Sequence, residues 1–279
     1  MAEGSSSFTV PARLIKAPMH LSASAQARLS PQPQFEYPPV EDKAAWRDLI
    51  EQVDRNMALG FESMAGHFEG GEACKTIAGL TAAMLQKRVW SIDYRMPPES
   101  PYPAGLDDGL AVYRALLQEH SPDEIIVNGL SAGGNLAAAL LLRAREAGLP
   151  MPAGLVLGTP EVDLTESGDS FQTNIGVDAV LRSLMPVNIM YANGTDLRDP
   201  HLSPLFGDLK GFPPTILYTG TRDLYLSNTV RMHRALRTAG VTAELHVMEA
   251  AGHSGFPGAP EGDAIYQEVR NFVASVLKG

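Results

Sequence analysis

The sequence predicts an α/β fold, a mainly parallel sheet flanked by helices, and two observations carry this prediction. First, short apolar runs of β-favouring residues alternate with longer segments of helical periodicity from about residue 72 onward. Second, the helical segment after Ser131 is apolar on almost every face, as expected for a helix buried against a sheet. Because strands that alternate with helices are joined by right-handed crossovers, the strands should run parallel.

Five runs should form the sheet, side by side in chain order: residues 89–94, 125–128, 154–158, 215–219 and 243–248. Helices are expected at residues 72–86, 104–119, 133–147, 225–239 and 261–278. The stretch between the third and fourth runs is too long for a simple connection. We therefore predict a cap or lid insertion at about residues 163–205, with a helix near 177–192.

The N-terminal part, residues 1–60, has a different character. Six prolines among residues 1–40 predict an extended arm with one short helix near 22–29. A cap helix should follow, because apolar residues recur at helical spacing and Gly60 offers an end to the helix. Those apolar residues are Trp46, Leu49, Ile50, Val53 and Met57.

Composition excludes several classes of function. The formal net charge of −10 argues against a surface that binds nucleic acid or an anionic membrane. Cys74 is the only cysteine, so we expect no intrachain disulfide, no metal site and a reducing compartment. No apolar run of signal-peptide or membrane-spanning length occurs. We therefore expect a cytoplasmic protein.

Residues 129–133 read Gly-Leu-Ser-Ala-Gly and stand between a strand-like run and a helical segment. This is the setting of a nucleophile elbow. The turn strains the serine backbone, and we expect side chains at Gly129 and Gly133 to collide across it. It lifts the Ser131 hydroxyl above the sheet and points N–H groups of the helix at the oxygen under attack. The alternative is a glycine-rich turn with an incidental serine.

An acid and a base follow later strands, in the loops where the carboxyl ends of a parallel sheet bring catalytic groups together. Asp223 follows the fourth run and His253 the fifth, so the chain order is Ser131, Asp223, His253. His253 would remove the serine proton, while Asp223 would orient the imidazole. Two alternatives stay open: Asp223 caps the helix that begins near Leu224, or Asp163 is the acid.

At this point the chain resembles the hormone-sensitive-lipase-like class of α/β-hydrolases, a group of bacterial esterases. The likeness covers about residues 70–279 and rests on Asp93-Tyr94-Arg95 with Pro97 and Pro98, Tyr102-Pro103-Ala104 with Asp107-Asp108, Gly129 to Leu136, Asp199-Pro200 with Leu202-Ser203-Pro204, and Gly220-Thr221-Arg222-Asp223. The resemblance implies a Ser131–His253–Asp223 triad, hydrolysis of short-acyl esters and no cofactor. It divides the chain into an arm and cap helix, residues 1–60, and a catalytic domain, residues 61–279.

One departure from that class concerns the oxyanion hole. The class carries a His-Gly-Gly-Gly motif upstream, where this chain has His67-Phe68-Glu69-Gly70-Gly71. Three strands expected there are also absent, which amounts to roughly 30–35 residues. We therefore expect run 89–94 to pair directly with run 125–128. The N–H of Ala132 should be one oxyanion donor, and Gly70 or Gly71 would supply the second.

The leading hypothesis is a serine carboxylesterase that acts on small esters through an acyl-enzyme. The alternative is a catalytically weak relative that binds a small ligand under its cap. A hydrolase of another bond, such as a peptide or lactone, would share the same machinery. A homodimer through the edge strand at 243–248 is also expected, since an unpaired edge invites pairing.

Overall fold

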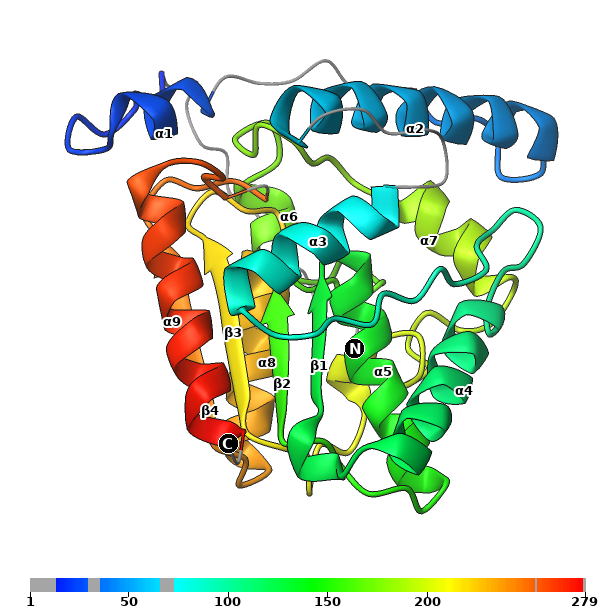
Figure 1. The fold of residues 1–279 in the computed structure, drawn as a ribbon. Helices are drawn as coiled ribbons and strands as arrows, with labels where there is room; N and C mark the ends of the chain where they lie inside the picture. Colours follow the sequence, from blue (N-terminus) through cyan, green and yellow to red (C-terminus); the bar gives the residue numbers. More distant parts are fainter. Residues whose placement is uncertain (1–13, 30–35, 66–72, 254, 278–279) are drawn as a thin grey trace, which may run out of the picture.

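A computed structural model describes residues 14–29, 36–65, 73–253 and 255–277 of the chain, and its centre is a four-stranded parallel sheet (Figure 1). The strands follow one another in the order β1-β2-β3-β4. They are β1 (Ile126–Leu130), β2 (Gly154–Gly158), β3 (Thr215–Gly220) and β4 (Ala243–Met248). The α/β class, the parallel direction and the order of these strands are as predicted. In this sheet β4 is an edge strand, as the predicted dimer through residues 243–248 requires. The dimer itself stays a prediction.

The predicted first strand, residues 89–94, is not a strand, and its direct pairing with β1 is wrong. The segment runs instead to the start of α4 (Ala104–Glu119), where a Cβ on Gly105 would lie 3.1 Å from the Arg95 carbonyl oxygen. The Arg95 N–H and guanidinium both donate to Asp108 of that helix. Residues 89–94 favour β structure, but they have no neighbouring strand among the described residues with which to pair, and the chain after them is held against α4. They therefore do not form a strand. Within the described residues no strand precedes β1.

Helices cover both faces of the sheet. Leu155 and Leu157 of β2 face α5 (Ala132–Glu146) and α8 (Leu226–Thr238), which pack in one apolar cluster with them. Val156 points to the opposite face, where it meets α9 (Pro260–Val276) and the end of α3 (Ala73–Leu85). This alternation along β2 is the period of two that a strand imposes.

The predicted helices 72–86, 104–119, 133–147, 225–239 and 261–278 agree with α3, α4, α5, α8 and α9 to within about two residues. The lid, which we define as residues 163–205, holds α6 (Ser170–Thr173), α7 (Met185–Ala192) and part of a 3₁₀ helix (Pro204–Phe206). The helix expected near 177–192 therefore begins only at Met185. A second short 3₁₀ helix, Pro122–Glu124, precedes β1.

The N-terminal helices lie beyond the ends of the strands to which the arrows point in Figure 1. They are α1 (Ala23–Ala27) and α2 (Lys43–Ala65), so α2 continues past Gly60, where we expected it to end. Leu21 and Ala25 pack against the loop after β4, and Ser22 donates to the Glu261 carboxylate from its N–H and its hydroxyl. Among the described helices, none combines the length and apolar character needed to cross a membrane.

Candidate active site

Ser131 lies at the turn between β1 and α5, in the backbone conformation that an elbow requires. Its φ of 56° and ψ of −122° place it in a region that non-glycine residues rarely adopt. This unfavourable backbone conformation is stabilised by the adjacent strand, because the Ser131 N–H donates to the Gly158 carbonyl of β2 at 2.9 Å. Its own carbonyl accepts from the Glu161 N–H at 3.2 Å. The turn is therefore fixed on both sides by the end of β2 and the loop after it.

The steric role of the glycines differs from the prediction at one position. A Cβ on Gly129 would lie 2.1 Å from the Gly133 carbonyl oxygen, so only glycine fits there, as expected. A Cβ on Gly133 would meet nothing within 4 Å, so the predicted collision at this position is wrong. The second constrained glycine is Gly134, whose Cβ would lie 2.8 Å from the Cβ of Pro160. The close approach is thus between the start of α5 and the loop after β2.

The structure brings Ser131, His253 and Asp223 together from three separate loops. His253 Nε2 lies 2.8 Å from the Ser131 hydroxyl oxygen, and His253 Nδ1 lies 3.2 Å from Asp223 Oδ1. These distances permit proton transfer from serine to imidazole with the ring oriented by the carboxylate. The Asp223 side chain is fully buried, and that of His253 is 10% exposed.

Asp223 is held in place by bonds from both sides. Its Oδ2 accepts from the Thr219 hydroxyl at 2.6 Å, and its Oδ1 accepts from the Tyr225 N–H at 2.9 Å. The carboxylate that faces His253 thus also binds a backbone N–H just before α8, but Asp223 is not the cap of that helix, whose N-cap residue is Tyr225. The Tyr225 ring stands edge-on to the imidazole at a centroid distance of 4.9 Å and limits its movement.

Asp163, the competing acid, lies elsewhere and is consumed by other partners. It is fully buried and accepts hydrogen bonds from Thr165, Ser167 and the Arg231 guanidinium, the last at 2.6 Å. Burial alone raises the pKa of the Asp163 carboxyl, but these bonds outweigh burial and hold that pKa below its ordinary value. The carboxylate therefore joins the lid to α8 through its bond with Arg231.

A largely apolar cavity of about 610 Å³ lies under α2 and the lid. It reaches the elbow at Ala132 and Asn135, both in the first turn of α5. The α2 helix contributes Trp46, Leu49, Ile50 and Val53, and the lid contributes Leu164, Val180, Leu181, Val187, Met190 and Tyr191. The volume and lining are those of a small-molecule site. These four α2 residues belong to the apolar stripe predicted on the cap helix, which thus forms one wall of this cavity; the Met57 side chain, the fifth member, lies outside what the structure describes.

Glu161 lies in the wall of the same cavity, and the sequence analysis did not single it out. Its side chain is 5% exposed, and Oε1 accepts from the Asn188 side chain of α7 at 2.9 Å. Burial raises the pKa of the Glu161 carboxyl to about 7. Its position after β2, in a loop at the carboxyl edge of the sheet, was the signal that could have found it.

The proposed oxyanion donors fall into two groups. Ala132 begins α5, so its N–H belongs to the first helical turn and has no partner within the helix. Gly70 and Gly71 lie outside the described residues, and their part in the site stays a prediction. In the described part of the chain, no three His, Cys, Asp or Glu side chains gather in a group that could hold a metal ion.

A parallel sheet with a serine elbow after one strand and an acid and a histidine after two later ones is typical of α/β-hydrolases. The family model for the alpha/beta hydrolase fold matches residues 65–257. A crystal structure of an esterase from the bacterial hormone-sensitive lipase family is 32% identical, with a TM-score of 0.71, over 75% of this chain and 72% of that one. The chain therefore belongs to the α/β-hydrolases and, among them, to the bacterial hormone-sensitive-lipase-like family.

Other relatives cover different shares of the chain. The crystal structure of an esterase, E25, is 34% identical with a TM-score of 0.83, and the match covers 98% of this chain and 99% of that one. An esterase of Acinetobacter venetianus is 38% identical over 57% of this chain, and an acetyl-hydrolase of Streptomyces hygroscopicus is 36% identical over 62%. The chain spans only 54% and 60% of the length of these two relatives.

Proposed function

We propose that the protein is a serine carboxylesterase that hydrolyses small, short-acyl esters through an acyl-enzyme. The observation that carries this proposal is the hydrogen-bonded series Ser131–His253–Asp223 beside the apolar cavity. Similarity to proteins named esterase, acetyl-hydrolase and carboxylesterase supports it. The acetyl-hydrolase, and a related esterase crystal soaked with p-nitrophenyl butyrate, support short acyl groups.

Each residue has a defined part in the reaction. His253 Nε2 takes the proton of the Ser131 hydroxyl while the serine oxygen attacks the ester carbonyl carbon. The carbonyl oxygen becomes negative and is stabilised by the N–H of Ala132, with Gly70 or Gly71 as the proposed second donor. The imidazolium, oriented by Asp223, then returns its proton to the departing alcohol, which leaves an acyl group on Ser131.

Water completes the cycle in the second half of the reaction. His253 takes a proton from a water molecule, whose oxygen attacks the acyl carbon. The tetrahedral intermediate collapses, the acid is released and Ser131 regains its proton from the imidazolium. The apolar cavity walls would hold the acyl or alcohol chain against the elbow while both steps occur.

The test is turnover of p-nitrophenyl acetate and butyrate by the purified protein and by Ser131→Ala. We expect the native chain to hydrolyse both esters and to be labelled by a fluorophosphonate probe. The variant should show neither hydrolysis nor labelling, because the nucleophile is gone. Ser24→Ala, which alters an exposed hydroxyl far along the chain, is the matched control and should behave as wild type. Labelling that persists in Ser131→Ala would contradict the assignment.

The rate itself distinguishes the two functional hypotheses. If only one oxyanion donor acts, turnover falls by about 10²–10³, so activated esters react slowly and unactivated esters hardly at all. A kcat of about 10 s⁻¹ or more on unactivated esters would show that a second donor is in place. Binding of small esters without any turnover would favour the alternative, a catalytically weak relative that binds a ligand under its cap.

A further inference from the structure

Asp178 is a buried carboxylate of the lid, and it binds four backbone N–H groups from three parts of the chain. The residue is only 2% exposed. Among the described residues, the hydrogen bonds to this carboxylate all come from peptide N–H groups and none from a charged side chain. Such an acceptor fixes the relative position of the segments that donate to it.

The two carboxylate oxygens have separate roles. Oδ1 accepts from Val180 at 2.8 Å and Leu181 at 3.1 Å, and so organises the lid segment that follows it. Oδ2 accepts from the N–H of Leu224 at 2.8 Å and the N–H of His253 at 3.2 Å. Leu224 directly follows Asp223. One oxygen therefore joins the loop of the proposed acid to the loop of the proposed base.

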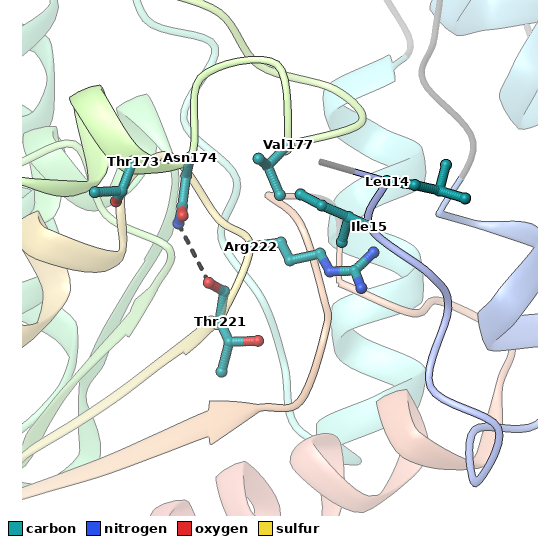
Figure 2. A pocket seen from close by; sticks show the side chains of 7 residues that line it. All are labelled: Leu14, Ile15, Thr173, Asn174, Val177, Thr221 and Arg222. Atoms are coloured by element: carbon teal, nitrogen blue, oxygen red, sulfur yellow. Dashed lines mark hydrogen bonds between the residues drawn. The ribbon is translucent and has the colours of Figure 1, made fainter. Parts of the chain in front are cut away.

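The surrounding contacts leave little room for this carboxylate to move. A Cβ on Gly252 would lie 3.1 Å from Asp178 Oδ1, so the histidine loop approaches the carboxylate closely. The Asn174 side-chain amide, also from the lid, donates to the backbone carbonyl oxygen of Thr221 (Figure 2). It also donates to the backbone carbonyl oxygen of Asp223 at 2.9 Å. The lid is thus bonded at two backbone carbonyl groups to the loop that carries Asp223.

We propose that Asp178 is a positioning residue that holds the Asp223 and His253 loops at the separation the triad needs and ties that separation to the lid. The proposal rests on the proposed esterase function. Asp178 touches neither substrate nor the reacting atoms; it acts through the backbone of His253 and of the residue after Asp223. Reactive geometry is sensitive to displacements of this kind, since a shift of about 1 Å costs on the order of 10² in rate.

The decisive variant is Asp178→Asn, which keeps the size of the side chain. An amide has one oxygen and one NH₂ group, so in either orientation two of the backbone N–H groups face a donor instead of an acceptor. We expect kcat on p-nitrophenyl butyrate to fall by about 10² while KM changes less than about three-fold. The rate of fluorophosphonate labelling of Ser131 should fall in parallel, because it depends on the same base.

Asp163→Asn is the matched control. Asp163 is equally buried in the same lid and also receives four hydrogen bonds, but none comes from the Asp223 or His253 loops. We expect it to lower the melting temperature without changing kcat by more than about two-fold. If both variants lower the melting temperature and neither lowers kcat, Asp178 has only a structural role and the proposal is wrong. A rise in KM with unchanged kcat would also overturn it.

Two further measurements keep the test decisive. If Asp178→Asn does not fold, Asn174→Ala removes only the side-chain bonds of the half-buried Asn174 to Thr221 and Asp223 and should lower kcat a few-fold at constant KM. If the wild type shows no turnover, the esterase assignment fails, and the low-field proton resonance of the His253 Nδ1–H shared with Asp223 still tests the geometry. We expect this resonance in wild type and in Asp163→Asn and its loss in Asp178→Asn; its persistence there would overturn the proposal.

Discussion

The two sides of the candidate site are built by different kinds of contact. On the triad side, Ser131, Asp223 and His253 follow β1, β3 and β4, and each is fixed by directional hydrogen bonds to side chains or backbone. On the cap side, α2 and the lid contribute mainly apolar side chains to the cavity wall. Hydrogen bonds fix atoms to within tenths of an ångström, whereas apolar contacts are non-directional.

This difference predicts how each side responds to substitution. Changes on the triad side should act on kcat, because they disturb the placement of the proton-transfer groups. Changes on the cap side should act on KM and on the choice of acyl chain, because they alter the apolar area that the substrate buries. Glu161 belongs to both, since it lines the cavity and its N–H donates to the Ser131 carbonyl.

The largest effect is expected for Asp223→Asn on the triad side. The amide NH₂ would face His253 Nδ1 and stabilise the tautomer in which Nε2 carries the proton and cannot accept the serine proton. We expect kcat on p-nitrophenyl butyrate to fall by about 10⁴ with a nearly unchanged KM. Steady-state kinetics of wild type and variant provide the measurement.

Asp163→Asn separates this prediction from general damage to the fold. It makes the same chemical change in a carboxylate that is equally buried but bound to Arg231. Nearly normal kcat is expected for this variant. The reverse pattern, in which Asp163→Asn is inactive and Asp223→Asn is not, would place the acid after β2 instead of β3.

The triad side was largely predictable from the sequence, because its parts follow short strands in an order that topology alone brings to one edge of the sheet. The failures have physical causes. Residues 89–94 have the composition of a strand, but no strand in the described part of the chain pairs with them, and Asp108 binds Arg95, the residue that follows. Asp178 and Glu161 could not be singled out from the sequence, because the role of a buried carboxylate depends on hydrogen-bond donors that are distant in sequence.

A second, smaller effect is expected where the two sides meet, in the pH dependence of stability. Burial raises the pKa of Glu161 from 4.5 to about 7 in the folded protein. A raised carboxyl pKa means that the folded state binds the proton more tightly than the unfolded chain. The contribution of this group to stability is therefore complete below about pH 4.5 and is lost as the pH rises through about 7.

Glu161→Gln tests this, because the amide stays neutral and its oxygen can still accept from Asn188. At pH 8 the variant should exceed wild type in unfolding free energy by up to about 3 kcal/mol, and the difference should vanish near pH 4.5. Urea unfolding at several pH values measures it. A constant difference across pH would mean that Glu161 titrates alike in both states.

The smallest effect is expected on the cap side, for Ile50→Ala in α2. Ile50 lines the cavity and is half-buried, so its truncation removes apolar surface that a longer acyl chain would bury. A loss of about 1 kcal/mol of binding corresponds to a rise of roughly five-fold in KM for a hexanoate ester. Acetate should be less affected, since its single methyl group lies at the reacting carbon and reaches less of the wall.

The control for this change lies two residues along the same helix. Gln52 is exposed and does not line the cavity, so Gln52→Ala changes the helix without changing its inner face. Its KM values for acetate and hexanoate esters should match those of wild type. Because the cap wall contacts substrate through surface area alone, Ile50→Ala should leave kcat within about two-fold of wild type. A fall in kcat comparable to that of Asp223→Asn would show that α2 helps to position the triad, and the two sides of the site would then not be separable.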